Sequence, residues 1–222
     1  MSEERERERA RELAHKARQT SKGSEWFESF YRKAETSKVK VPWDDGVPNP
    51  HLVRWLDARG EVSPGTRALD IGCGYGDNTV ELGKRGYSVM ATDISKTAVA
   101  RAKSRVADYN VEAQVQDILK PPTGWRERFD LVVEIYTMQV MPPPERARLV
   151  SVLPQLLRPG GAIVVVCRGR QPSDPLGQFP WPLIRSEVEG IAYEDVELVS
   201  FEDFMDDEDP PQRRFLAEFK RV

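Results

Sequence analysis

A glycine-rich segment at residues 69–77 carries the residue types most able to bind a small ligand. It reads Leu-Asp-Ile-Gly-Cys-Gly-Tyr-Gly-Asp, an apolar run that ends in a carboxylate and continues into alternating glycines. This order predicts a strand, a tight turn and a helix, because glycine accepts positive φ and the start of a helix offers free N–H donors. A dinucleotide fingerprint would have glycine at position 77, where this chain has Asp77. We therefore expect a nucleotide-type ligand without a pyrophosphate.

Two further strand-like runs also end in acids. Residues 87–92 lead into Asp93, and residues 111–116 lead into Asp117. Asp93 follows the first glycine by roughly 20 residues, the spacing at which a ribose diol finds its acceptor. Because parallel strands end at one edge of a sheet, where ligands bind, the three acids are expected to face one ligand. A ribose, an adenine amino group and a cationic amino-acid tail suit them, so S-adenosyl-L-methionine fits best.

With these motifs in this order, the chain resembles the class I S-adenosylmethionine-dependent methyltransferases over about residues 66 to 222. Residues 129–135 look like the fourth strand of that family, the Arg-Pro-Gly-Gly sequence at 158–161 like the turn before the fifth strand, and residues 162–167 like the fifth strand. The resemblance implies an α/β, Rossmann-like fold. It would have a seven-stranded, mostly parallel sheet, a C-terminal antiparallel hairpin and an N-terminal helical lid.

The resemblance also implies cofactor contacts. Asp70 and the glycine turn would hold the methionine portion, and Asp93 would take the ribose hydroxyls. Glu134, which ends the fourth strand, would lie beside the methionine portion. Asp117 would accept from the adenine amino group, and the backbone N–H of Ile118 would donate to the adenine. The predicted cofactor-binding residues are Trp26, Asp70, Gly72, Cys73, Gly74, Gly76, Asp93, Ile94, Asp117, Ile118 and Glu134.

These residues also have plain structural interpretations. Asp93 could cap the helix that follows it, although Ser95 fills that role better. Asp117 precedes a proline-containing loop and could be an ordinary turn residue. The glycine turn could be no more than a tight connection.

The sequence does not identify a catalytic residue, and we expect no metal. Methyl transfer from a sulfonium is an in-line displacement whose electrophile comes from the cofactor, so the protein chiefly aligns the reactants and excludes water. After Glu134 the chain lacks the Asn/Asp-Pro-Pro-aromatic sequence of enzymes that methylate amino groups of DNA and protein, and it lacks the Pro-Cys nucleophile of cytosine-C5 enzymes. We expect Cys73 and Cys167 to be small packed residues rather than nucleophiles.

Aromatic residues near the N-terminus and after the fourth strand indicate the acceptor class. Trp26, Phe30 and the Pro-Trp-Asp-x-Gly sequence at 42–46 resemble the lids of the thiopurine, thiol, halide and tellurite-resistance methyltransferase group. The resemblance implies a small acceptor, and a soft one such as a thiol needs little help from a base because part of it is already thiolate near neutral pH. The expected acceptor pocket consists of Phe30, Trp43, Tyr136, Met138, Phe179 and Trp181.

Several alternatives stay open. An oxygen or nitrogen acceptor would need a base, for which His51 is the histidine inside the expected fold. The aromatic residues could instead close a small accessory core. An enzyme that methylates RNA or protein would be expected to show a basic face or a recognition domain, and a non-catalytic relative would not need the glycines and acids.

Composition bounds the organisation. The 222 residues suffice for one sizeable α/β domain, and 33 Lys and Arg against 36 Asp and Glu give a net charge of −3, which disfavours a nucleic-acid partner. Two cysteines, a charged start and no membrane-length apolar run lead us to expect a cytoplasmic protein, as a monomer or weak homodimer. The expected order is a charged tail (1–22), a helical lid (23–60) and a methyltransferase domain (61–222), with helices at 50–59, 96–109 and from 183, and hairpin strands at 196–201 and 213–221.

Overall fold

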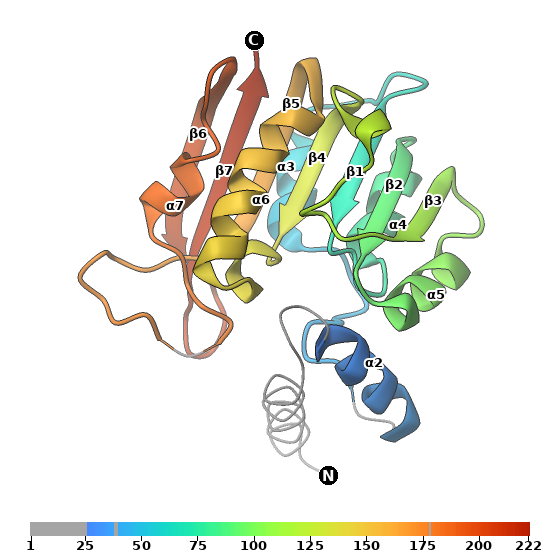
Figure 1. Ribbon diagram of the computed structural model, residues 1–222, viewed down its shortest axis with the longest axis horizontal. Helices are drawn as coiled ribbons and strands as arrows, with labels where there is room; N and C mark the ends of the chain where they lie inside the picture. The colour runs from blue at the N-terminus through green and yellow to red at the C-terminus, as the bar shows by residue number, and fades with distance from the viewer. Residues whose placement is uncertain (1–25, 38–39, 178) are drawn as a thin grey trace.

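The computed structural model describes residues 26–37, 40–177 and 179–222, and its centre is a seven-stranded sheet (Figure 1). The strands are β1 (Arg67–Ile71), β2 (Ser88–Asp93), β3 (Val111–Val115), β4 (Phe129–Ile135), β5 (Leu157–Arg168), β6 (Val196–Met205) and β7 (Arg213–Arg221). Their order in the sheet is β3-β2-β1-β4-β5-β7-β6. The first five of these are parallel, and β7 runs antiparallel to β5 and β6. The predicted mostly parallel sheet with a C-terminal antiparallel hairpin is confirmed.

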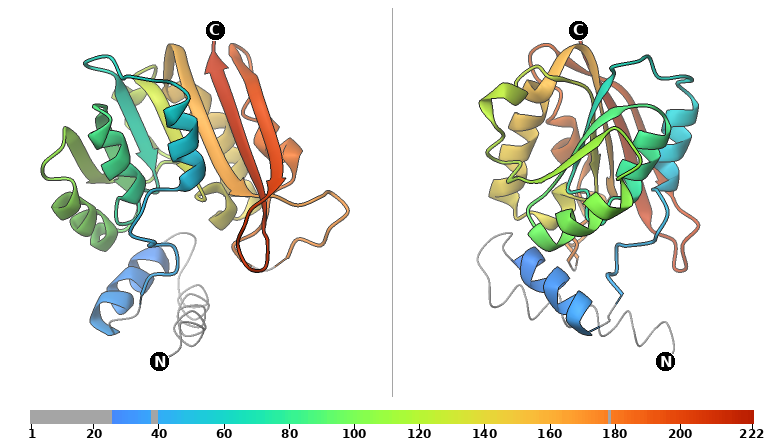
Figure 2. Two further views of the ribbon diagram at one scale, coloured as in Figure 1. Left: turned by 180° about the vertical axis from the view of Figure 1, so that it is seen from behind. Right: turned by 90° about the vertical axis from the view of Figure 1, so that its right-hand side faces the viewer.

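Helices cover both faces of the sheet (Figure 2). They are α2 (Trp26–Ser37), α3 (Pro50–Asp57), α4 (Asp77–Lys84), α5 (Lys96–Arg105), α6 (Pro143–Leu156) and α7 (Arg185–Glu189), with short 3-10 turns η2 (Thr123–Trp125) and η3 (Met138–Val140). One core cluster joins α3 and α4 to the sheet, and another joins α6 and α7 to its opposite face. Because helices lie on both sides, the central strands are nearly continuous apolar runs rather than alternating ones.

Local sequence sets where the helices begin and end. The side chain of Asn49 accepts from the first N–H groups of α3, and Pro50 takes the first helical position. Ser95 caps α5 by accepting from the N–H of Ala98 at 3.1 Å, as the sequence predicts. However, α5 ends at Arg105 rather than at residue 109, because the segment that follows is rich in residues that favour turns.

Other boundaries also differ from expectation, and α3 ends at Asp57 instead of residue 59. The Arg-Pro-Gly-Gly sequence lies inside β5 as an irregularity, since Phe129 pairs with Leu157 whereas Leu131 pairs with Ala162. β6 continues to Met205 instead of ending at residue 201, because the hairpin stays paired along its whole length. The helix expected from residue 183 begins at Arg185.

α2 lies across the edge at which the parallel strands end, apart from both faces of the sheet (Figure 1). α3 instead packs its Leu52, Trp55 and Leu56 in the core beneath the sheet. Within the segment predicted as a lid, residues 23–60, the part over the strand ends is therefore α2 and the loop after it. The predicted charged tail, residues 1–22, lies outside the described residues. In the described part of the chain, no helix combines the length and the apolar character needed to cross a membrane.

Candidate cofactor and acceptor site

The turn between β1 and α4 is held in a conformation that its glycines allow. Gly72, Gly74 and Gly76 have φ values of +64°, +55° and +91°. A Cβ on Gly72 would lie 2.3 Å from Oγ1 of Thr137, whose hydroxyl donates to the carbonyl of Ile71 at 3.0 Å. The glycine therefore serves both the left-handed backbone and the close approach of the loop after β4. This turn brings its backbone to the sheet edge where the predicted cofactor would bind.

Asp93, at the end of β2, is tied to the glycine turn. Its carboxylate accepts from the N–H of Gly74 at 3.0 Å and from the N–H of Ser95 at 2.8 Å. Burial raises its pKa to about 6, although these hydrogen bonds and one from the half-buried Ile94 favour the ionised form. The position of Asp93 fits both the structural interpretation and the cofactor-binding one. Its carboxylate stabilises the glycine turn, and it lies at the edge of the sheet where the parallel strands end.

Asp70 and Glu134 are two further buried carboxylates at the ends of β1 and β4. Thr79 donates to Asp70 at 2.5 Å, and Oε1 of Glu134 accepts from the N–H groups of Thr137 and Met138 at 2.8 and 2.7 Å. Burial raises the pKa of each carboxyl to about 7. Oε2 of Glu134 has no hydrogen-bond partner among the described residues. A ligand that carries positive charge would stabilise the ionised forms, so this edge fits the sulfonium and ammonium groups of S-adenosylmethionine.

Asp117 is less enclosed than the other acids. Its Oδ1 accepts from the N–H of Leu119 at 3.0 Å, and Oδ2 lies 3.6 Å from the ammonium of Lys120. Asp117 is therefore a turn residue, as its structural interpretation expects. Its Oδ2 lies near the exposed side chain of Lys120. Ile118 is buried against the core, with its backbone next to this turn. The adenine contacts of both residues stay predictions.

The aromatic residues of α2 pack against one another over the glycine turn. Trp26, Phe30 and Tyr31 are buried in a cluster that also takes in Trp43 and Phe179. Ring centroids lie 6.3 Å apart for Trp26 and Trp43, 4.9 Å for Phe30 and Trp43, and 5.4 Å for Trp26 and Phe179. These rings bury one another in a small cluster of their own, as the accessory-core alternative expects.

Charged residues that the sequence interpretation missed attach α2 to the sheet edge. Glu28 accepts from the hydroxyl of Ser95 at 2.7 Å and from the N–H and hydroxyl of Thr97 at 3.0 and 2.9 Å. Burial opposes ionisation of Glu28, but these hydrogen bonds outweigh it and lower its pKa. Ser95 therefore contacts both the lid and Asp93. Neither Glu28 nor Tyr31 has a local motif that marks it, since their partners lie far along the chain.

The loop after α2 is attached by a second set of charges. Arg105 lies 3.6 Å from Asp44 and 2.5 Å from Asp77, and it donates to the carbonyl of Tyr75. Asp77 also accepts from the N–H of Gly46 at 3.2 Å. Asp77 thus joins the loop after α2 to the glycine turn. It stands at the position where a dinucleotide fingerprint would have its last glycine.

The predicted acceptor residues separate into groups. Trp43, Phe179 and Phe30 lie in the aromatic cluster, and Trp181 extends it with its ring 5.4 Å from that of Phe179. Tyr136 instead packs against the core on the face of the sheet that α3 and α4 cover, and its φ is +65°.

Met138 is fully buried in the sheet core. Its side chain packs with α6 and β5, so it lies in the core and apart from the aromatic cluster that holds Phe30, Trp43 and Phe179.

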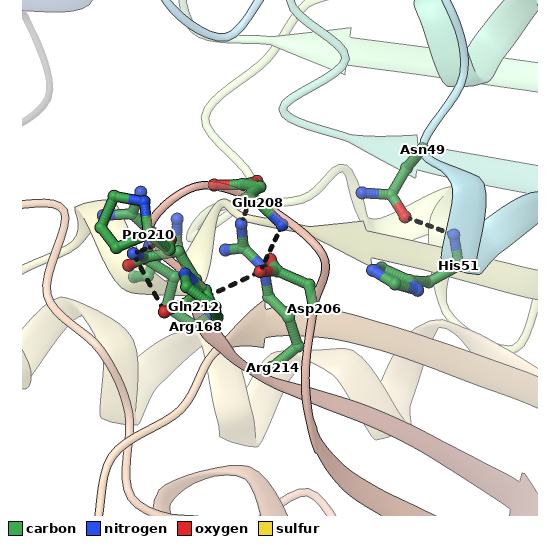
Figure 3. Close-up of polar contacts among 10 residues, drawn as sticks. Asn49, His51, Arg168, Asp206, Glu208, Pro210, Gln212 and Arg214 are labelled. Atoms are coloured by element: carbon green, nitrogen blue, oxygen red, sulfur yellow. Dashed lines mark hydrogen bonds and ion pairs between the residues drawn. The ribbon is translucent and has the colours of Figure 1, made fainter.

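His51 belongs to a polar cluster near the hairpin (Figure 3). Arg214, itself nearly fully buried, binds Asp206 at 2.6 Å and also pairs with Glu208, and its guanidinium lies 5.2 Å from the ring centre of Tyr136. His51 packs its ring against Phe204, and burial together with nearby arginines lowers its pKa. This histidine is held by the hairpin rather than by the aromatic cluster of the lid.

Neither cysteine has the surroundings of a nucleophile. Burial raises the pKa of both Cys73 and Cys167 well above the ordinary range, and nearby carboxylates raise it further. Both thiols are free. They fit the expected role of small packed residues.

A surface depression occurs at the opposite edge of the sheet. It is lined by Glu127, Pro154, Asp195 and Arg221, among others, near the start of β4 and the end of β7. It lies away from the glycine turn and the acidic strand ends, so it has no part in the site described above.

Comparisons with known proteins agree with this geometry. Residues 68–161 match the family model described as a methyltransferase domain. A probable thiol methyltransferase of Arabidopsis thaliana is 27% identical over 159 residues, which are 71% of this chain and 67% of that protein. A ubiquinone biosynthesis O-methyltransferase of Acinetobacter baumannii is 26% identical over 134 residues, 58% of this chain and 54% of that protein. The chain thus spans about half the length of the ubiquinone relative.

A solved structure from work on the conversion of a disulfide bond into a thioacetal group during echinomycin biosynthesis has the same fold. It aligns with a TM-score of 0.73 at 22% identity and covers 89% of this chain and 91% of its own. The family match, the relatives and the fold show that this chain carries a class I S-adenosylmethionine-dependent methyltransferase domain of the small-molecule type. S-adenosylmethionine is the cofactor of this family.

Proposed function

We propose that this protein transfers the methyl group of S-adenosylmethionine to a small, soft nucleophile, with a thiol as the first candidate. The observation that carries the proposal is the aromatic cluster of Trp26, Trp43 and Phe179, which packs against Tyr75 of the glycine turn through Tyr31. An apolar surface beside the donor suits an uncharged or polarisable acceptor. The similarity to a probable thiol methyltransferase supports the same class.

The residues of this chain have three tasks in such a reaction. Asp70, Asp93 and Glu134 supply negative charge at the strand ends, and the glycine turn supplies backbone contacts. When bound, S-adenosylmethionine supplies the activated methyl group. The lid keeps water away and holds the acceptor in line, which is the main protein contribution to a displacement of this kind.

Oxygen or nitrogen methylation is the second candidate. The ubiquinone relative is named as an O-methyltransferase, and such acceptors need a base. His51 is held against Phe204 at the hairpin, whereas Glu134 has a free carboxylate oxygen at the strand end and a pKa of about 7. An oxygen-directed reaction would therefore depend on Glu134 more than on His51.

The decisive experiment is a panel of thiols, phenols, amines and halide ions assayed with radiolabelled S-adenosylmethionine. We expect thiols to be the best acceptors, with rates that rise as pH approaches the thiol pKa and that survive His51→Ala. Preference for phenols or amines would transfer the assignment to oxygen or nitrogen. Loss of thiol turnover in His51→Ala while cofactor binding persists would show that the thiol acceptor needs His51 as a base. Absence of S-adenosylhomocysteine binding would contradict the cofactor assignment itself.

A further inference from the structure

Tyr31 of α2 contacts the glycine turn. Its side chain is buried, with 2% of its surface exposed, and its hydroxyl oxygen lies 3.0 Å from the position that a Cβ on Gly74 would occupy. The ring contacts that of Tyr75 at 5.1 Å between centroids. Gly74 in turn donates its N–H to Asp93. The phenol oxygen therefore stands over the part of the turn that faces the ligand edge.

The hydroxyl of Tyr31 is oriented by one hydrogen bond and has a proton left to give. Nε1 of Trp43 donates to the phenol oxygen at 2.6 Å, which occupies one acceptor position. Among the described residues, none accepts the proton of this hydroxyl. Burial and the nearby charge of Asp93 raise the pKa of Tyr31 well above its usual value, so the group stays a donor at all working pH values.

A buried donor of this kind normally has a partner, because an unpaired polar group away from water is costly. Two of the groups beside it, the N–H of Gly74 and the indole of Trp43, are themselves donors. The nearby carboxylate of Asp93 accepts from the N–H groups of Gly74 and Ser95, and it forms no hydrogen bond with this hydroxyl. A bound cofactor would bring oxygen atoms to this edge, on its ribose and on its carboxylate. Both are good acceptors.

We propose that Tyr31 is a cofactor-binding residue that donates its hydroxyl to an oxygen of bound S-adenosylmethionine, and that Trp43 positions this hydroxyl. The inference rests on the proposed cofactor site and adds a role for the lid. α2 then contributes a polar contact to the cofactor, beyond the apolar cover of the acceptor. Tyr31 and Trp43 join the two functions, since Trp43 also belongs to the aromatic cluster.

The test is calorimetric titration of the full chain with S-adenosylhomocysteine, which needs no acceptor. Tyr31→Phe removes only the hydroxyl, and we expect binding about tenfold weaker. Tyr87→Phe is the control, because it removes a phenol from a buried ring in the core beside α3 and α4, outside the glycine turn, and we expect affinity within about twofold of the original. Thermal unfolding of each variant checks that the lid still packs.

A double-mutant cycle with Trp43→Phe tests the positioning role. If Trp43 acts through the tyrosine hydroxyl, its substitution weakens binding in the original chain but has a smaller effect in the Tyr31→Phe background. Equal effects in both backgrounds would show that Trp43 contributes by packing alone and would overturn this part.

Methylthioadenosine, which lacks the amino-acid tail, distinguishes the two acceptor oxygens. A tenfold loss that persists with this ligand assigns the hydrogen bond to the ribose, and a loss that disappears assigns it to the carboxylate. Unchanged or tighter S-adenosylhomocysteine binding by Tyr31→Phe would overturn the inference and leave the cofactor site intact. Failure of the original chain to bind S-adenosylhomocysteine would instead overturn the proposed function.

Discussion

Asp93 and Glu134, at the sheet edge, are held by backbone hydrogen bonds, whereas the aromatic side chains of α2 and of the loop after it are held chiefly by ring contacts. Asp93 and Glu134 each accept from two N–H groups of nearby turns. Trp26 and Trp43 instead contact rings from other parts of the chain, including Phe179. The first arrangement depends on local backbone geometry and the second on long-range packing.

This difference separates rigid from adjustable parts of the site. A carboxylate fixed by N–H groups can move only if the turn that holds it moves. Rings that pack against one another can shift together at little cost in contact area. We therefore expect the strand ends to determine cofactor affinity and the lid to determine acceptor choice, with smaller effects of lid variants on cofactor binding.

Gly72→Ala should give the largest loss at the strand ends. The new Cβ would lie 2.3 Å from Oγ1 of Thr137, in a backbone with φ of +64°. The turn and the loop after β4 would both have to move, so we expect S-adenosylhomocysteine binding to weaken by about 100-fold, with a loss of about 1–3 kcal/mol in the free energy of unfolding. Calorimetric titration and urea unfolding measure the two effects.

Gly60→Ala is the control for Gly72→Ala. Gly60 has a φ of +74°, but a Cβ there would meet no atom within 4 Å. It should lose similar stability and keep its cofactor affinity. Equal binding by the two variants would show that the close approach of Thr137 does not shape the site.

Asp93→Asn should have the next largest effect. The amide removes the charge and directs an NH₂ group toward the N–H donors of Gly74 or Ser95, so we expect affinity for S-adenosylhomocysteine to fall by about 1.5–3 kcal/mol. Asp117→Asn, at a partly exposed turn, should change it by less than about threefold. Calorimetric titration of both variants with S-adenosylhomocysteine tests whether Asp93 matters more than Asp117. Equal losses of affinity in the two variants, or normal binding by Asp93→Asn, would contradict this prediction.

The same contrast explains what the sequence could reveal. β4 and β7 match their predicted ranges, and Ser95 caps α5 as expected, because each depends on residues close in the chain. The sequence does not predict Glu28 and Tyr31 as site residues, because their partners Ser95, Thr97 and Gly74 are brought near only by the docking of α2. The prediction of Met138 for the acceptor pocket rests on its neighbours in sequence, whereas its side chain lies in the sheet core.

The buried carboxylates predict how stability depends on pH. Burial raises the pKa of Asp70 from 3.8 to about 7, so the folded cofactor-free protein holds a proton that the unfolded chain has released. Stability should therefore fall as pH rises from about 4 to about 7, by at most about 1.4 kcal/mol per pH unit for this group. Urea unfolding between pH 4.5 and 8 measures the slope, and Asp70→Asn should make it shallower. An unchanged slope in Asp70→Asn would show that other groups control it.

Glu28→Gln should give the smallest effect, since it alters the attachment of the lid and leaves the strand ends in place. The amide keeps one oxygen for Thr97 or Ser95 and directs an NH₂ group toward the other donors. We expect S-adenosylhomocysteine binding to weaken by about threefold, because a partly exposed hydrogen-bonded charge contributes about 1 kcal/mol or less. Protease cleavage between Thr36 and Val41 should also become faster, and saturating ligand should slow it.

Glu35→Gln, on an exposed position of the same helix, should change neither measurement. If both variants behave like the original chain, the lid is held by its aromatic contacts alone, and the contact of Ser95 with both Glu28 and Asp93 carries no coupling between lid and cofactor.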